Sequence, residues 1–489
     1  MPGPKNVIVF YTDQQRADSL GCMGNAAAQT PNLDALAARG TLYTRHYATN
    51  TVCMPSRAAF ITGRYAQANR VLDNGIHLPA DQLTVAEVFR RSGCRTASFG
   101  KLHFQTFCPY EGDTSMESLA RWSAGELEDW TGPYYGFEEV GLAVGHGEGV
   151  SGHYGKWRER RFPTDKLGLD SAHGETRFPD FACWKSNLPV ECHHSTWVAD
   201  RAIEFLDGAG ARPFFLNVSF PDPHHPFTPP APYSTMFDDA DLPAPHAVEG
   251  ENDTKPEPYR RAMTASPFPT DGGARFHANM TPDVYRQIAA HTYGMVSLID
   301  HSVGRVLRKL DALGLADSTV IVFTSDHGDF LGDHFLLYKG QIPTRSLLNI
   351  PLIVADPSRG GGVSDAVCSN VDVAPTLLAS CGIEVPECMQ GAVLPAPGEQ
   401  PRRDYAFQAG WSKFSPDYQH YTIYTRDWRI SVFPNLRDGE LYDLRADPWE
   451  HRNLYHDPAH RAKREELTAE LLYAVGAAEP KRPPTVANW

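Results

Sequence analysis

Five short apolar runs that alternate with helical patterns constrain the fold of this chain more than any other feature. The runs are rich in β-branched and aromatic residues and cover residues 7–12, 96–100, 214–220, 319–325 and 352–355. Continuous apolar runs of this length are typical of strands buried on both faces. Helical patterns cover residues 31–39, 84–92, 198–206, 281–313 and 374–380. This alternation predicts an α/β fold, with a mostly parallel central sheet flanked by helices.

Two long segments depart from the pattern. Residues 105–191 and 228–281 are rich in proline, glycine, tryptophan and tyrosine and have little periodicity. Long segments of this kind inside a compact domain are usually lids or walls of a binding site. We weigh this interpretation equally with simple decoration of the surface.

The pattern of apolar runs changes again beyond about residue 385. Short runs at 421–425, 428–433 and 440–443 predict antiparallel strands, and a helix is expected over 461–475, ending before Gly476. We therefore expect a main domain over residues 1–385 that contains both long insertions. A smaller C-terminal α+β subdomain with a short antiparallel sheet is expected over residues 386–489.

Length, composition and charge narrow the class of protein. At 489 residues, 42% of them apolar, the chain can bury a large core. Its formal net charge of -14 argues against a general affinity for nucleic acid. Nine cysteines without metal-type spacing are typical of reduced thiols. The N-terminus leaves no room for a signal peptide and no stretch is long enough to span a bilayer, so we expect a cytoplasmic protein without membrane partners.

Polar clusters follow four of the five apolar runs. They are Asp13-Gln14-Gln15, Lys101 with His103, Asp222-Pro223-His224-His225, and Asp326-His327. In open α/β sheets, ligands bind in the crevice outside the carboxyl ends of the parallel strands. Four segments that are distant in sequence are therefore expected to meet at one site.

Two of these clusters predict a metal site. Asp13 follows Val-Ile-Val-Phe-Tyr-Thr, and Asp326 follows the closely similar Val-Ile-Val-Phe-Thr-Ser. Two carboxylates and the neutral imidazole of His327 form a donor set suited to Ca²⁺, Mg²⁺ or Mn²⁺. Either aspartate taken alone is more often a loop or helix cap. Their matching positions after two strands favour the metal site.

A further motif stands at the start of an expected helix. Cys53-Met54-Pro55-Ser56-Arg57 has the form Cys-x-Pro-x-Arg and resembles the signature of type I sulfatases, in the alkaline phosphatase-like superfamily. In that family a formylglycine-generating enzyme oxidises the cysteine to formylglycine, whose hydrate is the nucleophile. Arg57, one helical turn beyond Cys53, would hold the nucleophile in place. The simpler interpretation is a buried cysteine that only packs.

Other segments extend the resemblance, and family-like landmarks run from residue 6 to about residue 455. Gly100-Lys101-Leu102-His103 and Pro223-His224-His225-Pro226 match two motifs of the family. The catalytic residues that the resemblance implies are Cys53, Arg57, Lys101, His103, His224 and Lys339. Asn74 corresponds to a substrate-binding asparagine, although Asn74-Gly75 is also simply a good turn.

The metal ligands implied by the resemblance are Asp13, Gln14, Cys53, Asp326 and His327. Ca²⁺ is the ion expected first, with Mn²⁺ or Mg²⁺ as alternatives. Gln14 occupies a position where many similar enzymes carry a second acidic residue. This departure resembles choline sulfatases and phosphonate monoester hydrolases, and it leaves the identity of the metal open.

The resemblance implies hydrolysis of a sulfate monoester to an alcohol and inorganic sulfate. One hydroxyl of the formylglycine hydrate would attack sulfur, and His224, with Lys339, would protonate the leaving alcohol. His103 would then deprotonate the second hydroxyl, expelling sulfate and regenerating the aldehyde. The cations around the anion would stabilise charge that develops on its oxygens.

Three alternatives remain at this point. A phosphonate monoester or phosphodiester hydrolase would share the nucleophile, but such enzymes typically carry uncharged hydroxyl residues where this chain has Lys101 and His103. A metal-dependent phosphatase, with Cys53 unmodified or with a nucleophile elsewhere, would need a serine or threonine nucleophile and a richer set of ligands for two zinc ions. A catalytically inactive binding protein is disfavoured because nearly every polar position of the motifs is filled.

The organic part of the substrate cannot be read from the chain, so aryl, sugar and alkyl sulfates all remain open. Aromatic residues of the first insertion would either stack on a substrate or pack within the lid, and packing is favoured; they are Trp122, Trp130, Tyr134, Tyr135 and Trp157. The oligomeric state is also open, although similar cytosolic enzymes are commonly dimers or tetramers.

Overall fold

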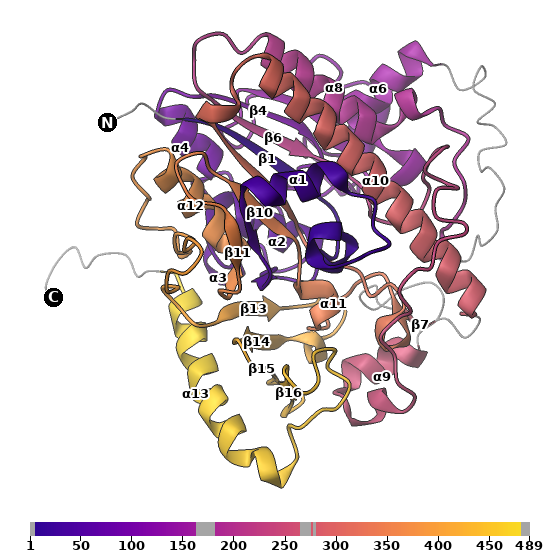
Figure 1. Cartoon of the computed structure of the whole chain (residues 1–489), viewed down its shortest axis with the longest axis vertical. Coiled ribbons are helices and arrows are strands. Elements are labelled where there is room, and N and C mark those ends of the chain that lie inside the picture. The colour runs from indigo at the N-terminus through magenta and orange to yellow at the C-terminus, as the bar shows by residue number, and fades with distance from the viewer. Residues whose placement is uncertain (1–4, 163–180, 265–274, 277–279, 481–489) are drawn as a thin grey trace, which may run out of the picture.

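The computed structural model describes residues 5–162, 181–264, 275–276 and 280–480, and its largest element is an eight-stranded sheet in the order β11-β2-β10-β8-β1-β6-β4-β5 (Figure 1). The strands are β1 (Asn6–Thr12), β2 (Thr41–Tyr43), β4 (Arg95–Gly100), β5 (Glu139–Val144), β6 (Phe214–Ser219), β8 (Thr319–Ser325), β10 (Leu352–Ala355) and β11 (Gly362–Ser364). All five predicted runs belong to this sheet, with ends within one residue of the expected ones.

The centre of the sheet is parallel, as predicted. The neighbouring strands β8, β1, β6, β4 and β5 all run in the same direction. β10 instead pairs antiparallel with both β8 and β2. A parallel return from β8 would need a crossover that runs back along the length of the strand, usually through a helix. The connection to β10 contains only short elements, of which the helix α11 (Arg345–Leu348) has four residues.

Helices cover both faces of the sheet, because alternate side chains of each strand point to opposite faces. Ile8 and Phe10 of β1 pack with the helices on one face, whereas Val7 and Val9 pack with those on the other. The first face is covered by α1 (Pro31–Arg39), α8 (His194–Asp207) and α10 (Pro282–Ala312). The second is covered by α2 (Cys53–Thr62), α4 (Val85–Arg91) and α12 (Val373–Ser380).

A second, antiparallel sheet lies near the C-terminus (Figure 1). It consists of β13 (Ala406–Gly410), β14 (His420–Tyr424), β15 (Trp428–Phe433) and β16 (Asp438–Asp443), and α13 (Arg461–Ala478) packs against it. The sequence predicted three of these strands but not β13. The expected end of the last helix before Gly476 is wrong: α13 continues to Ala478, because Ala474 and Ala478 are buried against the sheet.

The first long insertion contributes to the main sheet as well as to its surroundings. It contains α5 (Leu119–Ser123), β5 and α6 (Gly152–Arg161), and β5 extends the sheet beyond β4. The insertion therefore holds regular elements that its weak periodicity did not predict, and residues 163–180 lie outside the described residues. Among the described residues, the other α-helices and strands are α3 (Ala66–Asn69), α9 (Glu257–Thr264) and two short strand pairs. The pairs are β3 (His46–Tyr47) with β12 (Cys368–Ser369) and β7 (Arg275–Phe276) with β9 (Leu336–Leu337).

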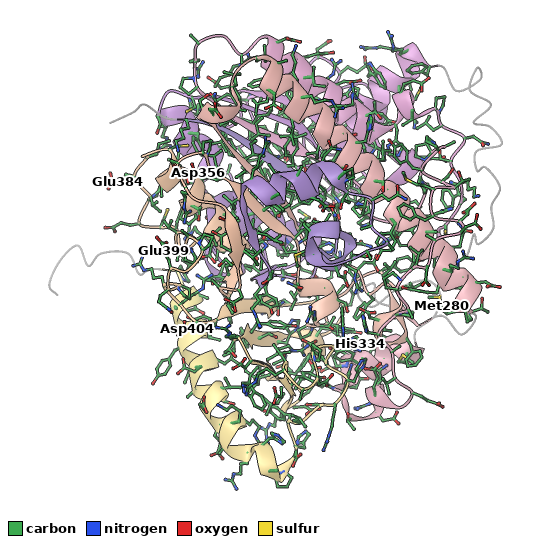
Figure 2. All side chains as sticks on the ribbon, viewed as in Figure 1. Met280, His334, Asp356, Glu384, Glu399 and Asp404 are labelled. Atoms are coloured by element: carbon green, nitrogen blue, oxygen red, sulfur yellow. The ribbon has the colours of Figure 1, made fainter. Side chains whose placement is uncertain are left out.

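Charged groups divide between the surface and a few buried networks. Glu384, Glu399 and Asp404 are exposed along the outer edge of the molecule (Figure 2). His334 is buried instead, with its Nδ1 atom 2.8 Å from a carboxylate oxygen of Glu251. Among the described helices, none combines the length and the apolar character that crossing a bilayer requires.

Candidate active site

Four parallel strands bring the predicted polar residues to one edge of the main sheet. Asp13 follows β1, Lys101 follows β4, Asp222 follows β6 and Asp326 follows β8. The backbone N–H of Asp13 donates to the carbonyl of Asp222 at 3.1 Å, and that of Asp326 donates to the carbonyl of Thr12 at 3.3 Å. The predicted convergence at the carboxyl ends is therefore present in the structure.

Cys53 lies at the centre of this group, as the first residue of α2 and only 2% exposed. Its Sγ atom lies 3.2 Å from His327 Nε2, 3.7 Å from Asp13 Oδ1 and 3.9 Å from Lys101 Nζ. Burial and Asp13 favour the neutral thiol, but the surrounding Lys101, Lys339 and His327 together lower the pKa of Cys53 from its ordinary value. The position is suited to a nucleophile that carries negative charge.

Arg57, in the same helix as Cys53, contacts both carboxylates at the strand ends. Its Nε atom lies 2.7 Å from Asp326 Oδ2, and its second guanidinium nitrogen lies 3.3 Å from Asp13 Oδ2. Burial alone would raise the pKa of Asp13, but Lys101 and Arg57 hold it well below its usual range. Asp13 therefore stays ionised in a site that solvent scarcely reaches.

Four buried donors lie close enough to hold one metal ion. Asp13, Cys53, Asp326 and His327 each offer a ligand atom, and these atoms all lie within 4.8 Å of one another. His327 Nδ1 lies 2.8 Å from the carbonyl oxygen of Gly328, so Nδ1 carries a proton and Nε2 faces the other donors. Two carboxylates and one imidazole fit a divalent cation.

Gln14, the remaining predicted ligand, lies at the border of this group in a left-handed backbone conformation with φ of 65°. Its backbone N–H donates to Asp326 Oδ1 at 2.9 Å. Its side-chain amide donates to Asp329 and contacts His225, while its Oε1 atom accepts from Lys339 Nζ at 2.5 Å. The role of Gln14 as a metal ligand stays a prediction.

Two lysines and two histidines predicted as catalytic residues lie near this donor group. Lys101 Nζ donates to Asp13, and Lys339 Nζ contacts His224 Nε2. His103 is 5% exposed, its ring packs at a tilt against Phe107, and its backbone N–H donates to Glu117 Oε2 at 2.6 Å. Burial, together with the neighbouring cations, holds the pKa values of His103 and His224 well below their ordinary range.

His146 is a site residue that sequence reasoning missed. Its ring stacks on that of His224, with centroids 3.5 Å apart and an angle of 7°, and its Nε2 atom lies 2.6 Å from Lys101 Nζ. It lies two residues after β5. The apolar run at residues 140–144, which is followed by Gly145 and His146, could have indicated a further strand with a polar residue at its end. It lies inside the first insertion, whose periodicity is weak.

Asn74 also lies beside the nucleophile position, because its Oδ1 atom accepts a hydrogen bond from the backbone N–H of Met54 at 2.9 Å. The aromatic residues of the first insertion mainly pack within the protein. Trp122 and Tyr134 are buried in the core, and the hydroxyl of Tyr134 donates to Glu117. The packing interpretation therefore holds for these two residues.

Two family models match large parts of the chain. A family model described as Sulfatase matches residues 5–383, and one described as N-sulphoglucosamine sulphohydrolase, C-terminal, matches residues 332–475. The chain is 30% identical to the multifunctional alkaline phosphatase superfamily protein PehA of Trinickia caryophylli, over 94% of this chain and 92% of that protein. It is 28% identical to an arylsulfatase of Clostridium perfringens, over 96% and 93% of the two chains.

A solved structure is also similar to this chain. The phosphonate monoester hydrolase of Agrobacterium radiobacter superposes with a TM-score of 0.79 at 27% identity, covering 98% of this chain and all of that one. A choline-sulfatase of Rhizobium meliloti is 25% identical over 96% of this chain and 85% of its own length. These relatives match the two branches that the Asp13-Gln14 opening resembles.

Proposed function

The chain belongs to the sulfatase family, and from this premise we propose that it hydrolyses sulfate monoesters with formylglycine at position 53 as the nucleophile. The observation that carries the proposal is the position of Cys53. It begins α2 in contact with the Asp13, His327 and Lys101 side chains, at the carboxyl edge of the sheet. A nucleophile at this position would face both the metal ligands and the cations that an ester anion requires.

The proposed reaction needs two groups that the chain would acquire, formylglycine and a divalent cation, and several side chains that it already has. When present, a formylglycine hydrate supplies the attacking oxygen and a divalent cation polarises a sulfate oxygen. Asp13, Asp326 and His327, with Gln14 at the border, would hold the cation. Lys101 and His103 would bind the remaining sulfate oxygens and oppose the charge that develops on them.

The leaving oxygen needs a proton, and the contact between His224 and Lys339 supplies a donor pair. Burial, stacked His146 and adjacent Lys339 lower the pKa of His224, so its imidazole is neutral before the substrate anion arrives. The ammonium of Lys339 touches His224 Nε2. We expect the pair to pass one proton to the departing alcohol, through whichever nitrogen lies closer to it.

The first experiment is peptide mass spectrometry on the Cys53 segment, using protein produced together with a formylglycine-generating enzyme. Hydrolysis of an aryl sulfate is measured on the same sample. Activity that follows the fraction of aldehyde, and that is lost in Cys53→Ala, supports the proposal. A thiol at position 53 in protein that still hydrolyses the ester would overturn the mechanism.

A phosphonate monoester or phosphodiester hydrolase is the second candidate, favoured by the similarity to the Agrobacterium radiobacter enzyme. The same sample decides between the two when kcat/KM is measured for an aryl sulfate and for an aryl phosphonate monoester. Lys101 and His103, in place of the uncharged hydroxyl residues expected of phosphonate monoester hydrolases, predict that the sulfate ester is the better substrate. A higher kcat/KM for the phosphonate would replace the first proposal with the second.

A further inference from the structure

The atom at position 53 changes the chemistry of the four buried donors. With cysteine present, the group offers one sulfur, one imidazole nitrogen and two carboxylate oxygens. Thiolate and imidazole ligands are typical of zinc sites, whereas Ca²⁺ and Mg²⁺ are bound by oxygen atoms. Conversion of Cys53 to formylglycine would remove the only sulfur of this four-residue group.

The separations between the donor atoms are close to those of a tetrahedral zinc site. With Zn–S bonds of about 2.3 Å and Zn–N and Zn–O bonds of about 2.0 Å, adjacent ligands lie roughly 3.3–3.6 Å apart. Cys53 Sγ lies 3.2 Å from His327 Nε2 and 3.7 Å from Asp13 Oδ1. His327 Nε2 lies 3.9 Å from Asp13 Oδ1 and 3.8 Å from Asp326 Oδ1. Small side-chain movements would bring all four atoms to one ion.

Outer contacts already orient the ligand atoms of His327, Asp13 and Asp326. The Nδ1 atom of His327 is bound to the Gly328 carbonyl, which leaves Nε2 for the ion. The Oδ2 atoms of Asp13 and Asp326 are both held by Arg57, so each Oδ1 atom faces the group. Partners of this kind orient metal ligands and strengthen binding.

From this donor set we infer that the chain as translated, with the Cys53 thiol intact, binds Zn²⁺ through Cys53, His327, Asp13 and Asp326. The inference rests on the proposed function only in that position 53 is converted in the working enzyme. In the metal-free chain Sγ and Nε2 are close enough, at 3.2 Å, to share one hydrogen bond. Zinc binds to both atoms, a Zn–S bond replaces any S–H bond, and the displaced proton passes to solvent without oxidation or reduction.

Zinc binding has a consequence for maturation of the protein. All four donor residues are at most 2% exposed, and a thiolate bound to zinc is no longer free to react as a nucleophile toward an oxidant. A chain that folds around zinc before conversion would therefore be held in the thiol form. Conversion and zinc binding thus compete for the same sulfur atom.

The test uses the full chain produced without a formylglycine-generating enzyme, with the thiol verified by mass spectrometry and metals removed by a chelator. Co²⁺ is added as a spectroscopic probe, followed by Zn²⁺. We expect a thiolate-to-cobalt charge-transfer band and the intense visible bands of tetrahedral Co²⁺, both abolished by one equivalent of zinc. Since loss of outer partners alone weakens binding about 10–100-fold, we expect Cys53→Ser to weaken zinc binding at least about 100-fold.

The chain has other thiols, so the control is Cys108→Ser, which removes an exposed cysteine. This variant should retain the charge-transfer band and the zinc affinity of the parent chain. A band that persists in Cys53→Ser, or no band in the parent chain, would overturn the inference. X-ray absorption of the zinc-loaded parent chain gives a check without mutation: one sulfur ligand is expected, and a shell of nitrogen and oxygen alone would contradict it.

The result of the zinc test can be distinguished from the result of the test of sulfate ester hydrolysis. The zinc test is carried out on the thiol form, whereas sulfate ester hydrolysis is measured on the converted form. Absence of thiolate–metal bands would leave the sulfatase proposal intact. A converted chain without sulfatase activity would leave the zinc result unaffected.

Discussion

At the scale of the residue, the site depends on one guanidinium matched to two buried carboxylates. Arg57 is 2% exposed and contacts both Asp13 and Asp326. A lysine offers a single ammonium and cannot reproduce both contacts. We expect Arg57→Lys to weaken divalent metal binding and to lower kcat/KM about 10–100-fold, as for loss of an orienting partner.

Steady-state kinetics at saturating metal and calorimetric metal titration measure these two effects. The matched control is Arg90→Lys, on the exposed surface of α4, where the arginine pairs with Glu87. It should leave both quantities unchanged. Unaltered metal binding in Arg57→Lys would show that the carboxylates do not need the guanidinium.

A second residue, His46 in β3, makes stability depend on pH. Burial lowers its pKa to about 3, whereas in an unfolded chain the value is about 6.5. Between these values only the unfolded state is protonated, so acidification lowers the free energy of unfolding by up to about 1.4 kcal/mol per pH unit from this group. His46→Gln should therefore reduce the slope of stability against pH in urea denaturation below about pH 6.5. The exposed His456→Gln is the control, and an unchanged slope in His46→Gln would refute the assignment.

At the scale of the element, α13 contains a glycine that the helix does not require. Gly476 is exposed, and a Cβ atom there would have open space around it. We expect Gly476→Ala to raise the free energy of unfolding by about 0.5–1 kcal/mol, because glycine loses more backbone entropy in a helix. Urea denaturation measures the change.

The contrasting variant is Gly63→Ala at the end of α2. Gly63 has φ of 63° and a Cβ atom would meet Met389 at 3.1 Å, so this substitution should destabilise the protein. Destabilisation by Gly476→Ala would instead mean that α13 ends before this residue in solution.

At the scale of the whole molecule, a buried ionic network connects the C-terminal sheet to the main body. Arg429 of β15 pairs with Glu440 of β16 and lies 2.5 Å from Glu450. Glu450 also accepts a hydrogen bond from the backbone N–H of Arg345 in α11 at 3.0 Å. Removing the guanidinium would leave two buried carboxylates without their main partner.

Arg429→Ala should therefore lower the free energy of unfolding by about 3–5 kcal/mol in chemical denaturation. Arg445→Ala, which removes an exposed arginine near Asp427 and Asp443, should change it by less than about 1 kcal/mol. Equal effects of the two variants would mean that the buried network does not stabilise the connection between the sheets.

Much of the fold was accessible from sequence because its signals are local. The runs that became β1 and β8 are mostly apolar, and each is followed directly by the aspartate that enters the site. The Cys53 motif likewise lies within one helical turn. Neither β5, which contains Gly141, nor β13, with the sequence Ala-Phe-Gln-Ala-Gly, carries a comparable signal. These two strands form because β4 and β14 offer partners for their backbone groups.

The chemistry-bearing residue types and the strands that carry them could thus be identified from the chain alone, since both depend on neighbours in sequence. The antiparallel direction of β10, the stacking of His146 on His224 and the single guanidinium shared by Asp13 and Asp326 could not. Each depends on contacts between segments far apart in the chain. Such contacts exist only once packing of the two helical layers has aligned the strands, and local periodicity carries no information about them.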